Sequence, residues 1–418
     1  MRESGFLKPV LIRWIDFWLG VPLCVIATAL RRMMEVGSNF WGRKNTDRQP
    51  RSVVFVQVTE IGAKVLAAPA YAYAAERVGW RNVYVLTFSD SVELLSIMGG
   101  VPEENVLALR KKNLFVFGWD LLGALWRLRK LGVEGCVNYE FFSRAGALIS
   151  WATGARVRAG LHRFTSELPY CGDLFTHRVN YNFSLHTAET FMVLVQALFS
   201  KRSEEPFLKE RIERKLVPPV FVPTSRDEEE VDELLRSMGA QSHGRRRWIF
   251  NPNAGDLLPL RKWPMKHWEE LVRLVAERYP DVDFIVTGTA SERGAVEDAI
   301  RRWPKGRVIN LCGLTTLRQL LTLYCRCEVL VTNDSGPGHF ASLTGIPVVV
   351  LFGPETPALW APLGDRVRAL NLGLACSPCV SVFNHRFSPC RNNVCMQEMQ
   401  PSFVLGAVES LLAGELKG

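Results

Sequence analysis

The sequence of 418 residues lacks an apolar run long enough for a comfortable transmembrane helix. Residues 17–30 (FWLGVPLCVIATAL) are nearly all apolar, but a membrane span needs about 20 residues, and Gly20–Pro22 interrupts the run. A secretory signal peptide also fits poorly, because Asp16 precedes the run and Arg31-Arg32 follows in place of a small-x-small cleavage site. The segment Phe6–Met34 therefore predicts a monotopic or re-entrant helix pair, bent at Gly20–Pro22.

Aromatic residues flank this segment. Tryptophan is enriched where membranes meet water, and Trp14, Trp18 and Trp41 stand in the expected places. The alternative is a hydrophobic helix packed on the protein itself.

Other absences narrow the function. We find no RNA-recognition, zinc-finger or helix-turn-helix signature, so nucleic acid is not expected as a partner. Ten cysteines in a chain of this length do not suggest a small disulfide scaffold. No internal repeat of about 20–50 residues is evident.

The formal net charge of +9 and the pI of about 9.1 favour anionic partners, such as nucleotide diphosphates and acidic lipid headgroups.

Short apolar, β-branched stretches alternate with helical patterns in both halves of the chain. This alternation is typical of α/β proteins with doubly wound parallel sheets. Two Rossmann-like domains are expected, and the predicted organisation is a membrane-associated segment, an N-terminal domain, a linker with a connecting helix, a C-terminal domain and a closing helix: 1–45, 50–200, 201–244, 245–398 and 399–418.

The most informative stretch is residues 329–354, which predicts strand, loop, helix and strand. Ser335 and Gly336 lie in the loop, where backbone N–H groups at the start of the helix can face an anion. Asp334 adds a carboxylate that can hold hydroxyl groups or an amine. The short helix is expected from His339 onward, so that His339 reaches the same place.

This stretch contains T-N-D-S-G-P-x-H followed by G-x-P-V-V-x-L-F-G-P, and it resembles the nucleotide-sugar signature of glycosyltransferase family 9, the heptosyltransferase-like enzymes. The resemblance implies a GT-B fold, with two Rossmann-like domains facing across a cleft. It implies an inverting, metal-independent transfer of a heptose or related sugar from a nucleotide diphosphate, an ADP-sugar rather than a UDP- or GDP-sugar. The acceptor would be lipid-linked or of lipopolysaccharide type, at the cytoplasmic face of the bacterial inner membrane.

The resemblance also assigns residues to the donor. Lys262 takes the place of a family lysine that meets the diphosphate, and Asn253 is expected in the same region. Glu292 matches a glutamate that accepts hydrogen bonds from the ribose hydroxyls. A D-x-D pattern at Asp281–Asp283 precedes a strand, where a turn favours Asp in any case, so no metal is expected there.

The chain departs from the family in its first strand-end loop, residues 60–64. Where the family has a catalytic aspartate, this chain has Ala63, which cannot accept a proton. Glu60 is the natural substitute, with Lys64 able to hold it ionised or to contact an acceptor phosphate. Asp90 and His186 are the next candidates for the base.

Four cysteines near the C-terminus have the spacing C-x2-C-x10-C-x4-C. Cys376, Cys379, Cys390 and Cys395, with His385 between them, are interpreted as structural thiols, with zinc or disulfides as alternatives.

Two other functions stay open. Because of Ala63, the chain could be a catalytically inactive nucleotide-sugar-binding scaffold of a glycan assembly complex. A nucleotide-sugar 2-epimerase also uses the GT-B fold, but the T-N-D-S-G-P signature argues against it.

Overall fold

The computed structural model divides into two compact units between Leu216 and Val217. It describes the whole chain apart from a set of short stretches: 1–8, 41–47, 59, 167, 206, 210–211, 213–215, 241–244, 256–257, 384–386 and 415–418. His385 and Trp41 lie outside the described residues.

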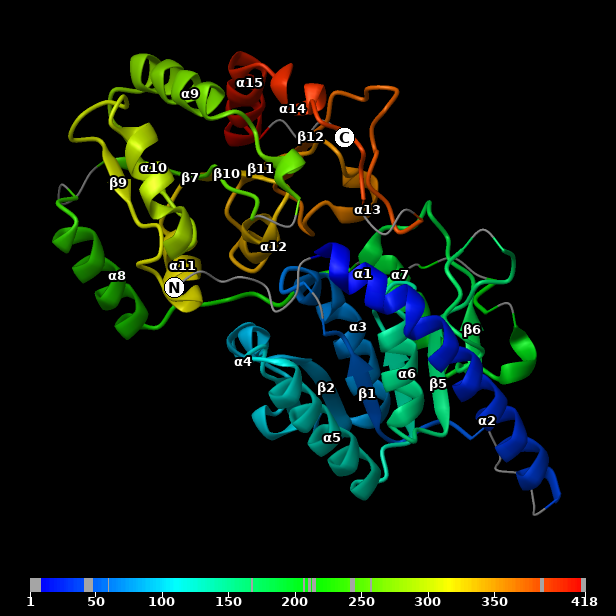
Figure 1. The fold of residues 1–418 in the computed structure, drawn as a ribbon. Helices are drawn as coiled ribbons and strands as arrows, with labels where there is room; N and C mark the ends of the chain where they lie inside the picture. Colours follow the sequence, from blue (N-terminus) through cyan, green and yellow to red (C-terminus); the bar gives the residue numbers. More distant parts are fainter. Residues whose placement is uncertain are drawn as a thin grey trace. The chain divides into compact units, whose positions relative to one another are not determined.

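The first unit is built on a parallel sheet of six strands in the order β3-β2-β1-β4-β5-β6 (Figure 1). Val53–Val56 is buried throughout, because a strand with helices on both faces has no side exposed to water. The strands are β1 (Val53–Val56), β2 (Val83–Phe88), β3 (Val106–Leu109), β4 (Gly135–Asn138), β5 (Val157–Leu161) and β6 (His177–Val179).

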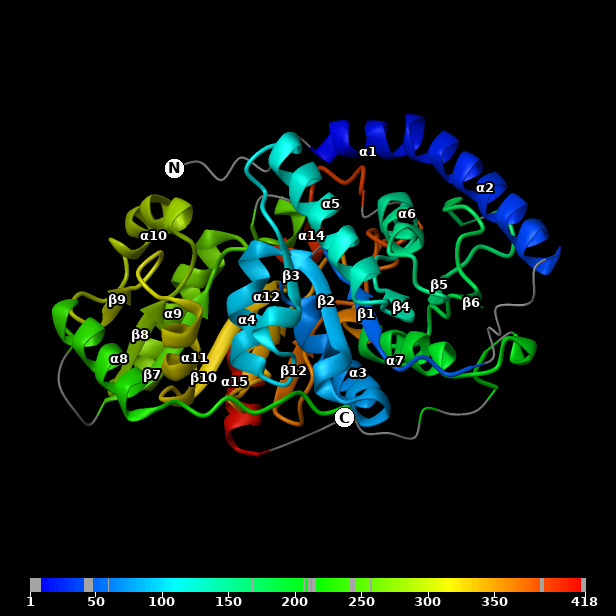
Figure 2. The ribbon, with the colours of Figure 1, turned by 90° about the horizontal axis from the view of Figure 1, so that it is seen from below.

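The helices of this unit cover the two faces of the sheet (Figure 2). One face carries the paired helices α3 and α7, and the other carries α5 and α6, with α1 and α2 lying over α6. The bounds are α1 (Pro9–Trp18), α2 (Gly20–Phe40), α3 (Ala63–Val78), α4 (Val92–Met98), α5 (Leu114–Lys130), α6 (Arg144–Ala152) and α7 (Thr187–Leu198).

The first two helices are nearly continuous. Their break falls at Leu19, one residue before the predicted bend, and Leu19 N still donates to Ile15 O at 2.9 Å. The helical stretch Trp14–Met34 is, by length and composition alone, long and apolar enough to cross a membrane, which the shorter apolar run did not suggest.

One side of this helix pair nevertheless packs on protein. Cys24 and Ala27 are buried, and two ion pairs tie the helices down: Asp16 with Arg144, and Arg31 with Asp173 at 2.6 Å. The expected packing of a hydrophobic helix on the protein is therefore found on one face of the pair, and the other face is exposed.

The second unit has its own parallel sheet, in the order β12-β11-β10-β7-β8-β9. Its strands are β7 (Arg246–Asn251), β8 (Val282–Val286), β9 (Val308–Asn310), β10 (Val329–Asn333), β11 (Val348–Leu351) and β12 (Val367–Leu370). Its helices are α8 (Ser225–Ser237), α9 (Met265–Arg278), α10 (Arg293–Ile300), α11 (Leu317–Cys325), α12 (Gly336–Ala341), α13 (Pro357–Trp360), α14 (Val394–Gln397) and α15 (Pro401–Leu412).

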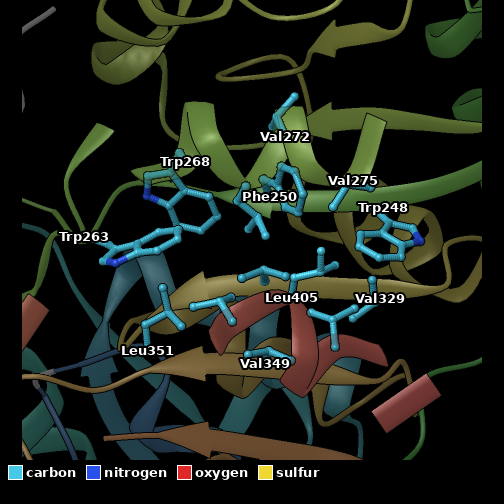
Figure 3. Packing of buried hydrophobic residues seen from close by; sticks show 14 of the residues in the cluster. Trp248, Phe250, Trp263, Trp268, Val272, Val275, Val329, Val349, Leu351 and Leu405 are labelled. Carbon is cyan, nitrogen blue, oxygen red and sulfur yellow. The ribbon is translucent and has the colours of Figure 1, made fainter. Parts of the chain in front are cut away.

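The core of this unit is aromatic where α9 and α15 meet the sheet (Figure 3). Trp263, Trp268 and Phe250 pack at one end, with the Trp263 and Trp268 rings 5.0 Å apart and edge-on. The Trp263 indole also donates to Met399 O at 2.9 Å, which fixes the loop before α9 against the C-terminal segment.

The predicted pair of parallel sheets is confirmed. The sequence pattern also predicts helices over 317–325 and 401–412, and α11 and α15 have these bounds. The sequence did not reveal β6 and β12, which are short edge strands with polar residues (HRV and VRAL). The Leu-, Trp- and Arg-rich pattern of residues 119–131 predicts a helix; α5 begins earlier, at Leu114, because Asn113 caps it by accepting from Val116 N at 2.9 Å.

Candidate functional site

The polar residues of the second unit gather at the carboxyl edge of its sheet. The loops after β7, β8, β10 and β11 emerge there side by side, because these strands are neighbours in the sheet. The strand order reverses between β7 and β10, and doubly wound sheets bind ligands at the carboxyl ends of the strands at such a switch point.

Asn333, at the end of β10, holds two of these loops together. Its side-chain amide donates to Pro252 O at 2.8 Å and accepts from Trp263 N at 3.1 Å, and the residue has no exposed surface. The loop that carries Lys262 is thereby fixed beside the Asp334 motif.

Three charged residues form a buried cluster beside this loop. Arg261 Nη1 lies 3.7 Å from Asp334 Oδ2, and Asp334 is only 4% exposed. Burial raises the pKa of Asp334 to about 6, against the opposing charge of Arg261. Burial, with the negative charge of Asp334, raises the pKa of Glu355 to about 8, so Glu355 holds a proton at neutral pH.

A second polar group lies at the end of β8. A side chain at Gly288 would meet Glu292 Oε2 at 2.9 Å, Cys312 Sγ at 3.0 Å and Asn253 Nδ2 at 3.3 Å. The predicted residues Asn253 and Glu292 therefore lie around Gly288, close to each other in the fold. Glu292 also closes the turn, accepting from Thr289 N at 2.7 Å.

The signature helix differs from its prediction. α12 begins at Gly336, with Ser335 as its N-cap, so His339 lies in its last turn and is not its first residue. The expectation of a helix starting at His339 was wrong, because Pro337 suits the first turn of a helix as well as a loop. His339 is buried, and Ser335 Oγ donates to Asn333 O at 3.1 Å.

Lys262 follows Arg261 in the same loop and is half-buried. Asn393 clamps its backbone from the C-terminal side, donating to Leu260 O at 2.9 Å and to Lys262 O at 3.3 Å. The predicted donor residues thus all lie in the segments that follow β7, β8 and β10 at one edge of one sheet: Asn253, Lys262, Glu292, Asp334, Ser335 and, in helix α12, His339.

In the first unit, Glu60 follows β1 at the corresponding carboxyl edge and is exposed. Its backbone has a φ of 48°, a left-handed conformation that non-glycine residues seldom adopt. Such strain concentrates at functional sites. The Lys64 ammonium group is 3.5 Å from the backbone oxygen of Glu60.

Lys64 is fully buried. Burial lowers its pKa to about 8, while the carboxylates of Glu140 and Asp90 act in the opposite direction. Asp90 itself pairs with Lys111. Carboxylates that follow β2 and β4 therefore act on one buried lysine, which also lies beside the backbone oxygen of Glu60.

The structure makes His186 a weaker candidate for the general base and Glu140 a stronger one. His186 is the N-cap of α7, where its Nδ1 accepts from Ala188 N at 3.2 Å, so its ring has a structural task. Glu140, which the sequence does not single out, follows β4, and its negative charge acts on Lys64. The sequence feature that indicates Glu140 is its position directly after a buried strand.

The cysteine segment packs against the site. Among the described residues, no three of His, Cys, Asp and Glu are placed to hold a metal ion. Cys395 and Met396 pack on Gly353, and Ser377 Oγ donates to Gly353 O at 2.5 Å, next to Glu355. Cys376, Cys379 and Cys390 lie in the same segment, where Cys379 Sγ accepts from Ser388 Oγ at 3.1 Å. At the D-x-D pattern, Asp283 pairs with Arg245 at 2.7 Å.

These features define a protein of two doubly wound α/β units, the second with a buried polar site at its switch point. The model of glycosyltransferase family 9 (heptosyltransferase) matches residues 143–386, more than half of the chain. The chain belongs to this family, and the resemblance seen in its motifs is confirmed.

Known relatives agree on the family. The lipopolysaccharide heptosyltransferase 2 of Salmonella typhimurium is 32% identical over 39% of this chain and 47% of its own length, and that of Escherichia coli is 35% identical over 29% and 35%. The chain thus aligns with less than half of each relative. A solved structure of the E. coli ADP-heptose LPS heptosyltransferase II has the same fold, with a TM-score of 0.65, 19% identity, and coverage of 87% of this chain and 99% of that one.

Proposed function

We propose that this protein is an inverting, metal-independent glycosyltransferase that transfers a heptose or related sugar from an ADP-linked donor to a lipopolysaccharide-type acceptor. Family membership supports the class of reaction. The relatives' names, and the ADP-heptose in the name of the structural neighbour, support the sugar and the nucleotide.

One observation carries the donor site. Asn253 Nδ2 and Arg261 Nε are buried polar atoms without a hydrogen-bond partner among the described residues, and Asp334 Oδ2 has the 3.7 Å ion pair with Arg261 Nη1 in place of a hydrogen bond. Such atoms are costly unless a ligand completes them. Two donors and one acceptor at a switch point suit a sugar diphosphate, with its anionic oxygens and its hydroxyl groups.

Within this proposal, the residues divide the donor between them. Lys262 and the backbone N–H groups at Ser335 and Gly336 bind the diphosphate. Glu292 accepts from the ribose hydroxyls. Asp334 accepts hydrogen bonds from hydroxyl groups of the sugar, and His339 contacts the donor in the same place.

The proposed reaction is a direct displacement. The acceptor hydroxyl oxygen forms a bond to the anomeric carbon, and the bond from that carbon to the diphosphate oxygen breaks, so the nucleoside diphosphate leaves with the electron pair. Glu60 takes the hydroxyl proton as a general base. Lys64, a buried cation next to Glu60, favours its ionised form or meets an acceptor phosphate.

We further propose that the first unit works at the cytoplasmic face of the inner membrane. The exposed side of α1 and α2 carries large apolar residues: Trp14, Phe17, Trp18, Leu19, Leu23, Val25, Ile26, Leu30, Met33, Met34 and Val36. The opposite side is anchored by ion pairs to the protein. A helix with one face bound to protein and one face apolar suits a bilayer surface better than a crossing.

A second candidate is the inactive scaffold. Ala63 is buried in the first turn of α3, where the family has its catalytic aspartate, and this observation alone favours the scaffold. Both candidates bind the donor, but only the enzyme turns it over.

Thermal unfolding with a panel of nucleotides tests the donor. A ligand that binds only the native state raises the melting temperature. ADP and ADP-heptose should raise it more than UDP or GDP at equal concentration. Equal effects of all three nucleotides would contradict the choice of ADP.

A further inference from the structure

Helix α5 has an exposed apolar stripe that the proposed reaction does not use. Phe115, Trp119, Leu122 and Trp126 follow at helical spacing, so they share one face, and they are 81%, 69%, 66% and 65% exposed. Leu114 extends the stripe at the start of the helix.

The stripe is not the core-facing side of the helix. Ala124 and Leu128 are buried on the sheet side, and Phe117, Leu121 and Leu125 pack against the same core. The helix is therefore apolar on two sides, and one of them faces water. A contiguous exposed apolar surface of this kind marks an interaction site.

Positive charge lies at both ends of the stripe. Lys112 precedes the helix and is exposed, and Lys130 ends it with its ammonium group 5.0 Å from the Trp126 ring centroid. The helix contains one acidic residue, Asp120, which is paired with Arg110 at 2.7 Å. Aromatic residues with flanking lysines fit the boundary between acyl chains and anionic headgroups.

The position of the helix points the same way. α5 lies on the face of the sheet that also carries α6 and, over it, α1 and α2 (Figure 2). Its first turn follows β3 by a few residues, next to the pair Lys111 and Asp90 at the carboxyl edge. A lipid-linked substrate leaving a bilayer at α5 would arrive at this edge, where Glu60 and Lys64 also lie.

We propose that α5 is a second membrane-contact surface, which docks its aromatic stripe on an anionic bilayer alongside the surface formed by α1 and α2. This inference rests on the membrane placement proposed above and extends it to a part of the chain outside the N-terminal segment.

Vesicle co-sedimentation of the full chain tests the proposal. The triple variant Phe115→Ser, Trp119→Ser, Trp126→Ser should bind phosphatidylglycerol-containing vesicles at least about tenfold more weakly. Phe183→Ser is the control, since Phe183 is 68% exposed but lies outside α5, in the segment before α7. The control should bind like the unchanged protein.

The charge component has its own variant. Lys112→Gln and Lys130→Gln should each lower the affinity for phosphatidylglycerol vesicles by about fivefold. The affinity for purely phosphatidylcholine vesicles should not change. Equal losses on both lipids would contradict a role for these lysines in reading lipid charge.

Three outcomes distinguish the proposal for α5 from the proposal for α1 and α2. Unchanged vesicle binding by the triple variant overturns the role of α5, even if the variant Trp14→Ser, Trp18→Ser, Ile26→Ser releases the protein. A change in oligomeric state by light scattering, with vesicle binding unchanged, makes the stripe a contact between copies and also overturns the proposal. If neither variant weakens binding, the membrane placement fails as well. An unchanged melting temperature shows that each variant is folded.

Discussion

Arg261 and Asp334 form an ion pair of 3.7 Å that joins the loop after β7 to the signature motif after β10. The Arg261 cation acts on two buried carboxyl groups, those of Asp334 and Glu355. One cation balances one negative charge, so one of the two carboxyl groups keeps its proton. That group is Glu355.

This cluster predicts a pH-dependent stability. The pKa of Glu355 rises from 4.5 to about 8 on folding. Between these values the native state keeps a proton that the unfolded chain has lost, so the free energy of unfolding falls as pH rises. Glu355→Gln keeps the shape of the neutral acid and should remove this dependence, with a gain on the order of 3 kcal/mol by pH 8.

Urea unfolding at pH 5 and pH 8 measures the effect. Glu398→Gln is the control, because Glu398 is exposed in the same unit. A gain from Glu355→Gln of equal size at both pH values would show that Glu355 is not held protonated.

Asn333→Ala should disconnect the donor loops. The substitution leaves Pro252 O and Trp263 N without their partner, and each buried group left unsatisfied costs about 1–3 kcal/mol. We expect a lower melting temperature and weaker ADP binding by calorimetry. Asn82→Ala removes one exposed side-chain hydrogen bond, to Val78 O, and should change neither quantity much.

Lys262→Ala should weaken ADP binding at least about tenfold, because a lost charge-assisted hydrogen bond costs about 1.5–3 kcal/mol. Lys266→Ala, four residues later and exposed on α9, is the matched control. If both variants bind ADP like the unchanged protein, Lys262 has no part in the donor site.

Serine at Trp14, Trp18 and Ile26 should release the chain from membranes without unfolding it, because these side chains are exposed. Deleting residues 6–34 is the less informative change. It would strip Asp16 from Arg144, whose side chain is 5% exposed, and a buried charge without its partner is destabilising. Fractionation of cells that express each form gives the readout.

The sequence predicts the elements that have long apolar patterns and misses what depends on folding. The two sheets follow from buried runs such as Val53–Val56, and the donor loops follow from a motif that is contiguous in the chain. The sequence does not single out Glu355 and Glu140, because each is an isolated carboxylate. Only the strand order brings Glu355 close to Asp334, and Glu140 close to Lys64.

The burial of Lys64 was beyond the sequence for a similar reason. A lysine in the first turn of a helix is ordinarily solvated, and the packing that covers this one comes from segments far along the chain, near Glu140. The left-handed backbone of Glu60 likewise has no signature in its residue type.

The most direct test is turnover of ADP-heptose with a lipopolysaccharide-type acceptor, followed by mass spectrometry of the acceptor. The unchanged protein should add one heptose. Glu60→Gln should lower the rate by at least about a hundredfold while ADP binding stays the same, and Glu140→Gln compares the second carboxylate. If the protein binds ADP-heptose but yields no product with any such acceptor, the enzyme proposal is contradicted and the inactive scaffold takes its place.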